Sequence, residues 1–332
     1  MPKPSVDPIV WKPPPATARA KQKHSEREFT LDVFDLPGKG PEDVVVDAAG
    51  NVWAGIEDGR ILRISPDGRT IDTIGDTGGR PLGIEIDPDG DLRICDAHLG
   101  VLSLDPRTGK VTSVVDTIAG TPMKFCNNGA LAKDGTGYFT DSSTKFGIEH
   151  YKGELFEHRG TGRLFRRTPD GSVDLVADGF HFANGVALTP DESWVAVAQT
   201  SAYSLDRIWL TGPSAGRREP FVANLPAFPD NISTGSDGLI WVALPSPRDA
   251  VLDLLLPRPP ALRKLAWAMP EMLQPKAKKT VWVQAYDADG RLVHDLQTTH
   301  PRFWMTTGVR EIDGVVWLGS LAAPAVARID LR

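Results

Sequence analysis

Oxygen-bearing side chains recur at one position of a repeated pattern in this sequence. A short apolar segment, an Asp-rich turn and a second apolar segment follow one another six times, with the turn position at Gly50, Gly90, Gly135, Glu192, Gly238 and Gly314. Eight residues before these positions stand Glu42, Leu82, Asn127, Asn184, Asp230 and Thr306. Four of the six carry carboxylate or amide oxygens, the ligands that hard cations such as Ca²⁺ prefer.

A shared site for these side chains would favour a bound cation. Glu42 and Asp230 would repel each other in a buried place unless a positive charge neutralised them. The six positions include no Cys or His, which argues against zinc, and rigid strand ends suit the variable coordination of Ca²⁺. For any single residue, capping of the backbone is the alternative. Among the residues that follow these positions, Asn231 is either a further ligand or a turn residue.

The elements that must bring these residues together are β-hairpins. Turn residues that accept positive φ join the paired segments, and a second hairpin such as "GRILRISPDGRTIDTI" follows in five of the six units. Four strands in each of six units predict an all-β fold, a six-bladed β-propeller. The last unit ends early, and the segment Arg27 to Leu36 is available to complete it. In such a fold the six positions converge on the central channel at one face.

The rest of the chain divides into an arm and two insertions. Residues 1–26 are rich in Pro and Lys and predict an arm over the surface, followed by one propeller domain over 27–332. Insertions at about 141–160 and 245–279 predict helical segments near one face, the second with two short helices separated by prolines. This second insertion is interpreted as a substrate lid, an oligomer contact or a structural brace. Shallow membrane association through 250–272 is a further alternative.

Composition limits the partners. The 332 residues carry a net charge of −6 with a pI near 5.7, which argues against nucleic acid as a partner. No apolar h-region and no stretch of transmembrane length is seen, so we expect a soluble cytoplasmic protein. The cysteines, Cys95 and Cys126, are either two free buried thiols or one disulfide.

Several segments in order resemble a known family. "GPEDVVVD", "DAHLGVLSLD", "FTDSSTKF", "TGRLFRRTPDG", "FANGVALTPD", "NLPAFPDNIS" and "VWLGSL" are similar to strictosidine synthase-like proteins, within the wider group of paraoxonase, gluconolactonase/regucalcin and diisopropylfluorophosphatase propellers. The resemblance spans roughly residues 38 to 332. It implies one calcium ion in the channel, with the ligands on Glu42, Asn127, Asn184, Asp230 and Asn231. In paraoxonases a second, deeper ion is held by an Asp beside each of two ligands. Here Asp43 fits one of these positions, but the other is Asn128, which puts the second ion in doubt.

The resemblance also implies an activity. The expected reaction is calcium-assisted hydrolysis of an ester or lactone, including organophosphate esters, on a small-molecule substrate. His98, or Asp230 itself, is the candidate base or nucleophile. The condensation of strictosidine synthase needs a glutamate where this sequence has Thr307, with Glu311 displaced along the strand, so that reaction is not expected. The alternatives are a non-catalytic propeller that binds a ligand or partner around a structural calcium, or such a condensing enzyme. The oligomeric state is left open.

Three further histidines are weaker candidates for a catalytic role. His181, three residues before Asn184, is interpreted as structural or surface-exposed. His150 and His158 lie in the first insertion, which could fold over the channel mouth.

Overall fold

Six four-stranded antiparallel sheets make up most of the computed structural model, which describes residues 3–270, 272, 274 and 277–332. From the channel outward, blade 1 contains β2 (Val45–Val46), β3 (Val52–Gly55), β4 (Arg60–Ile64) and β5 (Ile71–Asp76), blade 2 contains β6 (Pro81–Ile86), β7 (Leu92–Asp96), β8 (Gly100–Leu104) and β9 (Val111–Val115), and blade 3 contains β12 (Cys126–Leu131), β13 (Gly137–Asp141), β14 (Gly162–Arg167) and β15 (Val173–Phe180). Blade 4 contains β16 (Ala183–Leu188), β17 (Trp194–Gln199), β18 (Ser204–Trp209) and β19 (Arg218–Val222), and blade 5 contains β20 (Ile232–Thr234), β21 (Ile240–Ala243), β22 (Val281–Tyr286) and β23 (Leu292–Thr298).

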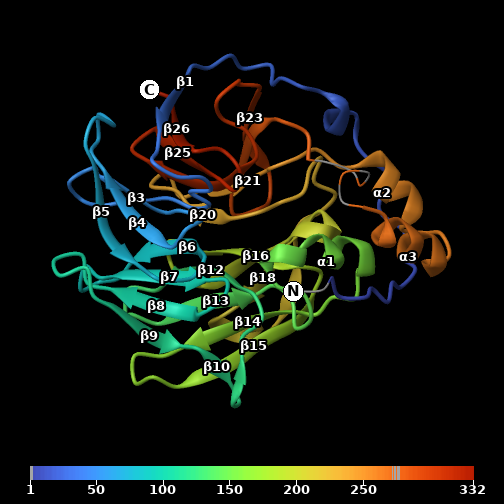
Figure 1. Cartoon of the computed structure of the whole chain (residues 1–332), viewed down its shortest axis with the longest axis horizontal. Coiled ribbons are helices and arrows are strands. Elements are labelled where there is room, and N and C mark those ends of the chain that lie inside the picture. Colours follow the sequence, from blue (N-terminus) through green and yellow to red (C-terminus); the bar gives the residue numbers. More distant parts are fainter. Residues whose placement is uncertain (1–2, 271, 273, 275–276) are drawn as a thin grey trace.

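Blade 6 closes the ring with strands from both ends of the chain. It contains β24 (Thr306–Ile312), β25 (Val315–Ser320), β26 (Ala325–Asp330) and, on its outer edge, β1 (Leu31–Asp35), which pairs with β26 from Leu31↔Ile329 to Asp35↔Ala325. The inner strands contact one another in the order β2, β6, β12, β16, β20, β24 and back to β2. The predicted six-bladed β-propeller, with its last blade completed by the early strand, is therefore confirmed (Figure 1).

The Asp-rich turns form because each offers a side-chain acceptor and a residue with positive φ. In the first blade, Asp47 accepts the backbone N–H groups of Ala49 and Asn51, each at 2.9 Å, and Gly50 has a φ of 81°. Glycine carries no steric penalty there. Glu192 occupies the same position in blade 4 with a φ of 57°, so the turn is kept without the glycine.

The core lies between neighbouring blades. Val45, Trp53 and Ile61 of blade 1, for example, pack against Ile84 and Ile94 of blade 2. Side chains of successive strand residues point to opposite faces, so each blade can bury apolar residues against both neighbours.

A further cluster between blades 2 and 3 contains both cysteines. Cys95 and Cys126 are buried in it as free thiols, which confirms the first of the two sequence-based alternatives.

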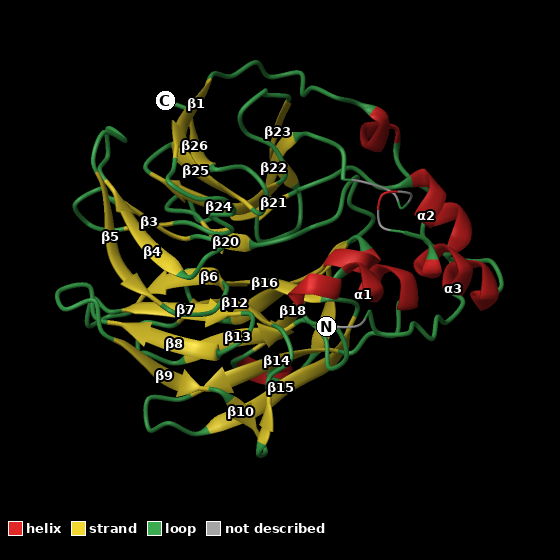
Figure 2. Cartoon of the chain, viewed as in Figure 1, coloured by secondary structure: helices red, strands yellow, loops and turns green. Residues whose placement is uncertain are grey.

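The helices gather beside the sheets (Figure 2). The first insertion forms η2 (Ile148–His150) and α1 (Lys152–Glu157), and the second forms α2 (Ala250–Leu255) and α3 (Pro260–Ala268), with α1 and α3 in contact. Smaller elements are η1 (Ala18–Lys21), η3 (Thr200–Ala202), η4 (Gly212–Ser214) and the hairpin of β10 (Thr117–Ile118) and β11 (Thr121–Pro122). Among the described residues, no helix has the length and apolar character needed to cross a membrane.

Candidate functional site

Four of the predicted ring residues line one cavity. Its volume is about 470 Å³, and Glu42, Asn127, Asn184 and Asp230 reach it from blades 1, 3, 4 and 5. Leu82, the ring residue of blade 2, lines the same cavity. The repeat register read from the sequence therefore places the side chains of different blades around one space.

Two hydroxyl groups fix the orientation of the asparagine amides. The Nδ2 group of Asn127 donates to Ser142 Oγ at 2.8 Å, and that hydroxyl donates to the carbonyl of Ala183 at 2.6 Å. The Nδ2 group of Asn184 likewise donates to Thr200 Oγ1 at 3.0 Å. Because each hydroxyl proton is committed to a backbone carbonyl, the hydroxyl oxygen can only accept from the amide. The Oδ1 atoms of both asparagines are left buried with no hydrogen-bond partner.

Asn231, the residue after Asp230, contacts the ring through Glu42. Its Nδ2 group donates to both carboxylate oxygens of Glu42, at 3.0 and 2.9 Å, and its Oδ1 is a third buried amide oxygen without a partner. An unsatisfied buried polar group costs roughly 1–3 kcal/mol. Three such oxygens next to two carboxylates mark a place built for a positively charged partner.

Burial and mutual repulsion act on the two ring carboxylates. Burial, followed by the charges of Asp230 and Asp43, raises the pKa of Glu42 well above its usual range, while Asn231 and the buried Arg80 act in the opposite direction. Burial, together with the charge of Asp43, raises the pKa of Asp230 to about 7 against the hydrogen bond from Asn184. Both pKa shifts follow from the cost of holding two negative charges close together in a buried place.

The donor set fits calcium. The oxygens come from two carboxylates and three amides, and Ca²⁺ accepts both kinds in flexible geometry. No group of three or more His, Cys, Asp or Glu side chains suited to a metal occurs in the described part of the chain, so the site depends on its amides. The residues that would hold the ion are Glu42, Asn127, Asn184, Asp230 and Asn231.

The residues one step deeper connect neighbouring blades. Asp43 accepts from the backbone N–H of Val44 at 2.9 Å and from Asn128 Nδ2 at 3.0 Å, and Asn128 Oδ1 accepts from the N–H of Val186 in blade 4 at 2.9 Å. Gly83 permits the close approach of blades 2 and 3, since a Cβ there would lie 2.7 Å from the Cα of Asn128. Hydrogen bonds within the protein thus engage the oxygens of Asp43 and Asn128 and connect blades 1, 3 and 4.

The fold does not bring a glutamate to the position that the condensation reaction of strictosidine synthase requires. Thr307, which stands there in the sequence, donates through Oγ1 to the carbonyl of Glu42 at 2.7 Å. Glu311 lies at the other end of β24, where it accepts from Ser236 Oγ at 2.9 Å and from the N–H of Gly314 at 2.6 Å. Its carboxylate stabilises a turn and is separated from the cavity.

Above the ring, the cavity is walled by the two insertions, which together we call the cap (residues 141–160 and 245–279). Leu155 and Phe156 from α1, Leu252 and Leu255 from α2, and Ala266 from α3 line it. Leu254 of α2 and Leu262 and Leu265 of α3, which do not line the cavity, expose apolar side chains to solvent, and Val251, which lines it, is also exposed. Contact of 250–272 with a membrane surface stays a prediction.

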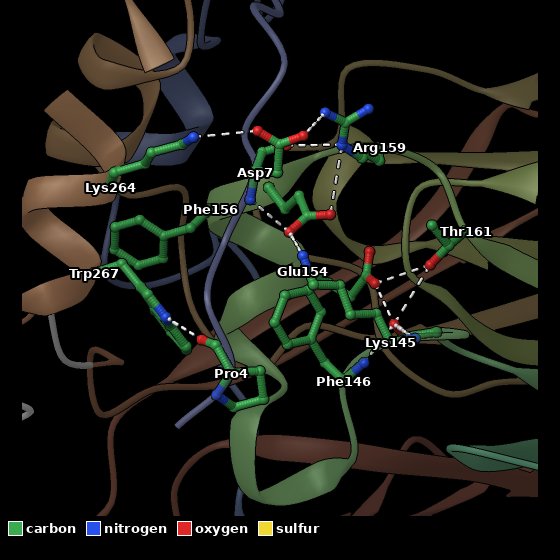
Figure 3. Close-up of polar contacts among 12 residues, drawn as sticks. Pro4, Asp7, Lys145, Phe146, Glu154, Phe156, Arg159, Thr161, Lys264 and Trp267 are labelled. Carbon is green, nitrogen blue, oxygen red and sulfur yellow. Dashed lines mark hydrogen bonds and ion pairs between the residues drawn. The ribbon is translucent and has the colours of Figure 1, made fainter. Parts of the chain in front are cut away.

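The N-terminal arm ties the two halves of the cap together (Figure 3). Val6 is buried in a small apolar cluster with Phe146, Phe156, Ala266 and Trp267. Asp7 lies between two cations, paired with Arg159 beside α1 and with Lys264 of α3 at 3.2 Å. The indole of Trp267 donates to the carbonyl of Pro4 at 2.8 Å. The arm therefore forms part of the structure that encloses the cavity.

The structure does not bring His98 to the ring. Asp96 accepts the backbone N–H groups of His98 and Leu99 at 2.9 and 3.1 Å, which turns the chain outward at the end of β7. The imidazole is half-exposed and pairs with Glu149 at 2.6 Å, and it is absent from the cavity lining. His98 is thus not a lining residue of the cavity, and its assignment as the base stays a prediction, whereas the other candidate, Asp230, lines the cavity.

The other histidines near the cap serve packing. The rings of His158 and His181 stack at 4.3 Å, and Trp11 of the arm covers His158 at 4.0 Å. Burial lowers the pKa of His158 to about 2. His150 lies at the end of η2 and does not line the cavity.

Known proteins of similar sequence span nearly the whole chain. Residues 76–252 match the family model described as "SMP-30/Gluconolactonase/LRE-like region". Residues 30–64 match the model of the strictosidine synthase-like N-terminal region. Adipocyte plasma membrane-associated protein of Danio rerio is 33% identical over 320 residues, covering 88% of this chain and 75% of that protein. Protein strictosidine synthase-like 6 of Arabidopsis thaliana is 31% identical, covering 88% and 79%.

Solved structures agree on the fold. A gluconolactonase from Xanthomonas campestris superposes with a TM-score of 0.67 at 18% identity, over 100% of this chain and 99% of that one. Regucalcin of Agrobacterium tumefaciens, described as a calcium-binding protein, gives 0.63 at 15% identity, over 92% and 96%. The propeller and the sequence matches together place this chain in the SMP-30/gluconolactonase/LRE-like family, as a strictosidine synthase-like member of it.

Proposed function

We propose that this protein is a calcium-dependent hydrolase of esters or lactones. The observation that carries the proposal is the set of three buried amide oxygens without partners, on Asn127, Asn184 and Asn231, together with two carboxylates; Asn231 contacts Glu42, and the other four residues line one cavity. Bound there, Ca²⁺ would polarise a carbonyl group and stabilise negative charge on its oxygen. Membership of a family named for gluconolactonase supports a hydrolase of this general kind.

Asp230 is the residue best placed to handle a proton. Both Glu42 and Asp230 line the cavity, but Glu42 is buried and hydrogen-bonded twice to Asn231, whereas Asp230 keeps part of its surface exposed. In the proposed reaction a carboxylate oxygen of Asp230 takes a proton from the attacking water as the new C–O bond forms. The proton then passes to the leaving alkoxide when the ester bond breaks.

The cap defines the kind of substrate that fits. Beside the ring, the cavity wall is dominated by apolar side chains, including Phe125, Phe182 and Phe228 from the blades and the leucines of the cap. Such a wall offers few hydrogen bonds to sugar hydroxyls and favours a substrate with an alkyl or aromatic group. We therefore expect an uncharged ester or lactone that carries a large apolar substituent.

The test is hydrolysis of phenyl acetate and of lactones that differ only in alkyl chain length, with and without chelator. Wild-type protein should hydrolyse the longer-chain lactones with the higher kcat/KM and lose activity in chelator. Asp230→Asn should lower kcat/KM by about 10²–10⁴, the usual contribution of a general base. Asp174→Asn, which changes a half-exposed carboxylate on the outer strand of blade 3, is the matched control and should leave activity unchanged.

Each other result points to a definite alternative. Activity that survives complete removal of calcium contradicts the metal-assisted mechanism. Calcium binding without hydrolysis of any ester or lactone favours a propeller that binds a ligand around a structural ion. Condensation of an amine with an aldehyde would point to a synthase like the plant enzymes.

A further inference from the structure

A buried ion pair crosses the channel below the ring. Arg310 on β24 donates from Nη2 to Oε1 of Glu85 on β6 at 2.5 Å, and both side chains are largely buried, with 12% and 19% of their surfaces exposed. These strands are the inner strands of blades 6 and 2, which blade 1 separates. Side chains of such strands can meet only across the central channel.

The depth of the pair follows from the strand geometry. Glu85 lies three residues along β6 from Leu82, and Arg310 lies four residues along β24 from Thr306. At about 3.3 Å per residue the pair is roughly 10–13 Å deeper than the ring.

Asp43 of blade 1 lies between the ring and this pair. It is 3% exposed, and Gly308 of β24, two residues before Arg310, leaves room for it: a Cβ on Gly308 would come within 2.8 Å of Asp43 Oδ1. The backbone N–H of Ile84, the residue before Glu85 on β6, donates to Asp43 Oδ2 at 3.4 Å, which holds Asp43 close to that strand. The deeper channel thus holds two carboxylates, Asp43 and Glu85, and a fixed positive charge beside them.

We propose that Arg310 is the resident cation of the deeper channel, and that it leaves the ring as the one place in the channel for a divalent ion. This inference rests on the proposed metal centre. A guanidinium remains charged at every physiological pH and donates to carboxylates in a fixed geometry, so it supplies the positive charge without exchange with solvent. Removal of one partner of a buried ion pair leaves the other charge uncompensated. Without Arg310, Asp43 and Glu85 would form a second carboxylate site.

The first experiment counts bound calcium by native mass spectrometry and isothermal titration calorimetry. Wild-type protein should bind one ion. Arg310→Gln should bind a second, weaker ion, whereas Arg310→Lys, which keeps the charge, should bind one. The double variant Glu85→Gln/Arg310→Gln should also bind one. Arg328→Gln, on β26 of the same blade and paired with Asp32 at 3.0 Å on the surface, is the control and should match wild type.

The second experiment measures thermal unfolding in chelator and so does not depend on any metal. Arg310→Gln should lower Tm relative to wild type and to Arg328→Gln, and the double variant should recover part of the loss. Equal Tm values for Arg310→Gln and wild type would overturn the inference. So would two ions on the wild-type protein, or an Arg310→Gln variant with one ion of unchanged affinity. A wild-type protein that binds no calcium would overturn the metal centre and this inference together.

Discussion

Ser142 and Thr200 determine which atoms of the ring asparagines face the cavity. Each hydroxyl donates its proton to a backbone carbonyl in the next blade, Ala183 for Ser142 and Pro229 for Thr200, at 2.6 and 2.8 Å. Each therefore accepts the asparagine N–H and directs Oδ1 into the site. Neither residue is one of the proposed ligands, although Thr200 lines the cavity, and each orients a ligand amide.

Loss of either hydroxyl should weaken calcium binding. Ser142→Ala and Thr200→Val should each raise the Kd by about 10–100-fold, because residues that orient metal ligands typically contribute this much. Calorimetric titration measures the change, and Ser172→Ala, in the exposed turn before β15, serves as the control. Variants that bind as tightly as wild type would show that the amides are held by other contacts.

His158 should make stability depend on pH. Its folded pKa is lowered to about 2 from a usual 6.5, by burial first and by the charges of His181 and Arg263. Below pH 6.5 His158 is protonated in the unfolded chain but stays neutral in the folded chain. The free energy of unfolding therefore falls as the pH falls. The free energy of unfolding should decline between pH 7 and 5 more steeply in wild type than in His158→Asn, as urea titrations can measure. Parallel slopes would contradict this role.

For single residues, the sequence predicted which residues line the cavity better than it predicted how their side chains are oriented. The register of the repeat placed Glu42, Asn127, Asn184 and Asp230 in one cavity, because a propeller makes equivalent positions converge. The hydroxyls that orient the amides follow other strands and act across blades, so no local pattern indicates them. That His98 does not line the cavity could not be predicted, because a strand end does not reveal which way the next turn leads the chain.

The arm, α1 and α3 form one unit at the scale of elements. Arg263 of α3, fully buried, donates from Nη1 to the carbonyl of Phe156 at 2.8 Å and from Nη2 to that of Ile9 in the arm. The sequence predicted the insertions and a short pair of helices from their prolines. It could not show that the arm packs into them, since these contacts join segments more than a hundred residues apart.

A charge at Val6 should loosen the cap and leave the blades intact. Val6→Asp places an unpaired carboxylate in the apolar cluster of Phe146, Phe156 and Trp267, which is costly. Hydrogen exchange should become faster in α1 and α3 and stay unchanged in the blades, and KM for apolar substrates should rise. Val10→Asp, at an exposed position of the same arm, is the control. Equal exchange in both variants would show that the arm does not hold the cap.

For the whole molecule, the repeat alone was enough to predict the blades and their closure, because each unit is too small to bury its own apolar faces. The channel contents were not predictable in the same way. Arg310 and Glu85 lie in blades that are far apart in sequence, and only the closed ring brings them together.

The pairing of β1 with β26 has a consequence for how the protein folds during its synthesis. Leu31 of β1 pairs with Ile329 of β26, so the first strand of the propeller can pair only after its last strand has been synthesised. Contacts of such sequence separation slow folding, because the entropy of closing the loop precedes the gain from pairing. On the ribosome blades 1 to 5 can form in order, but blade 6, which closes the ring against blade 1, is missing until its strands have been synthesised. A chain stopped before blade 6 would keep every proposed calcium ligand and still lack the closed ring that holds them in place.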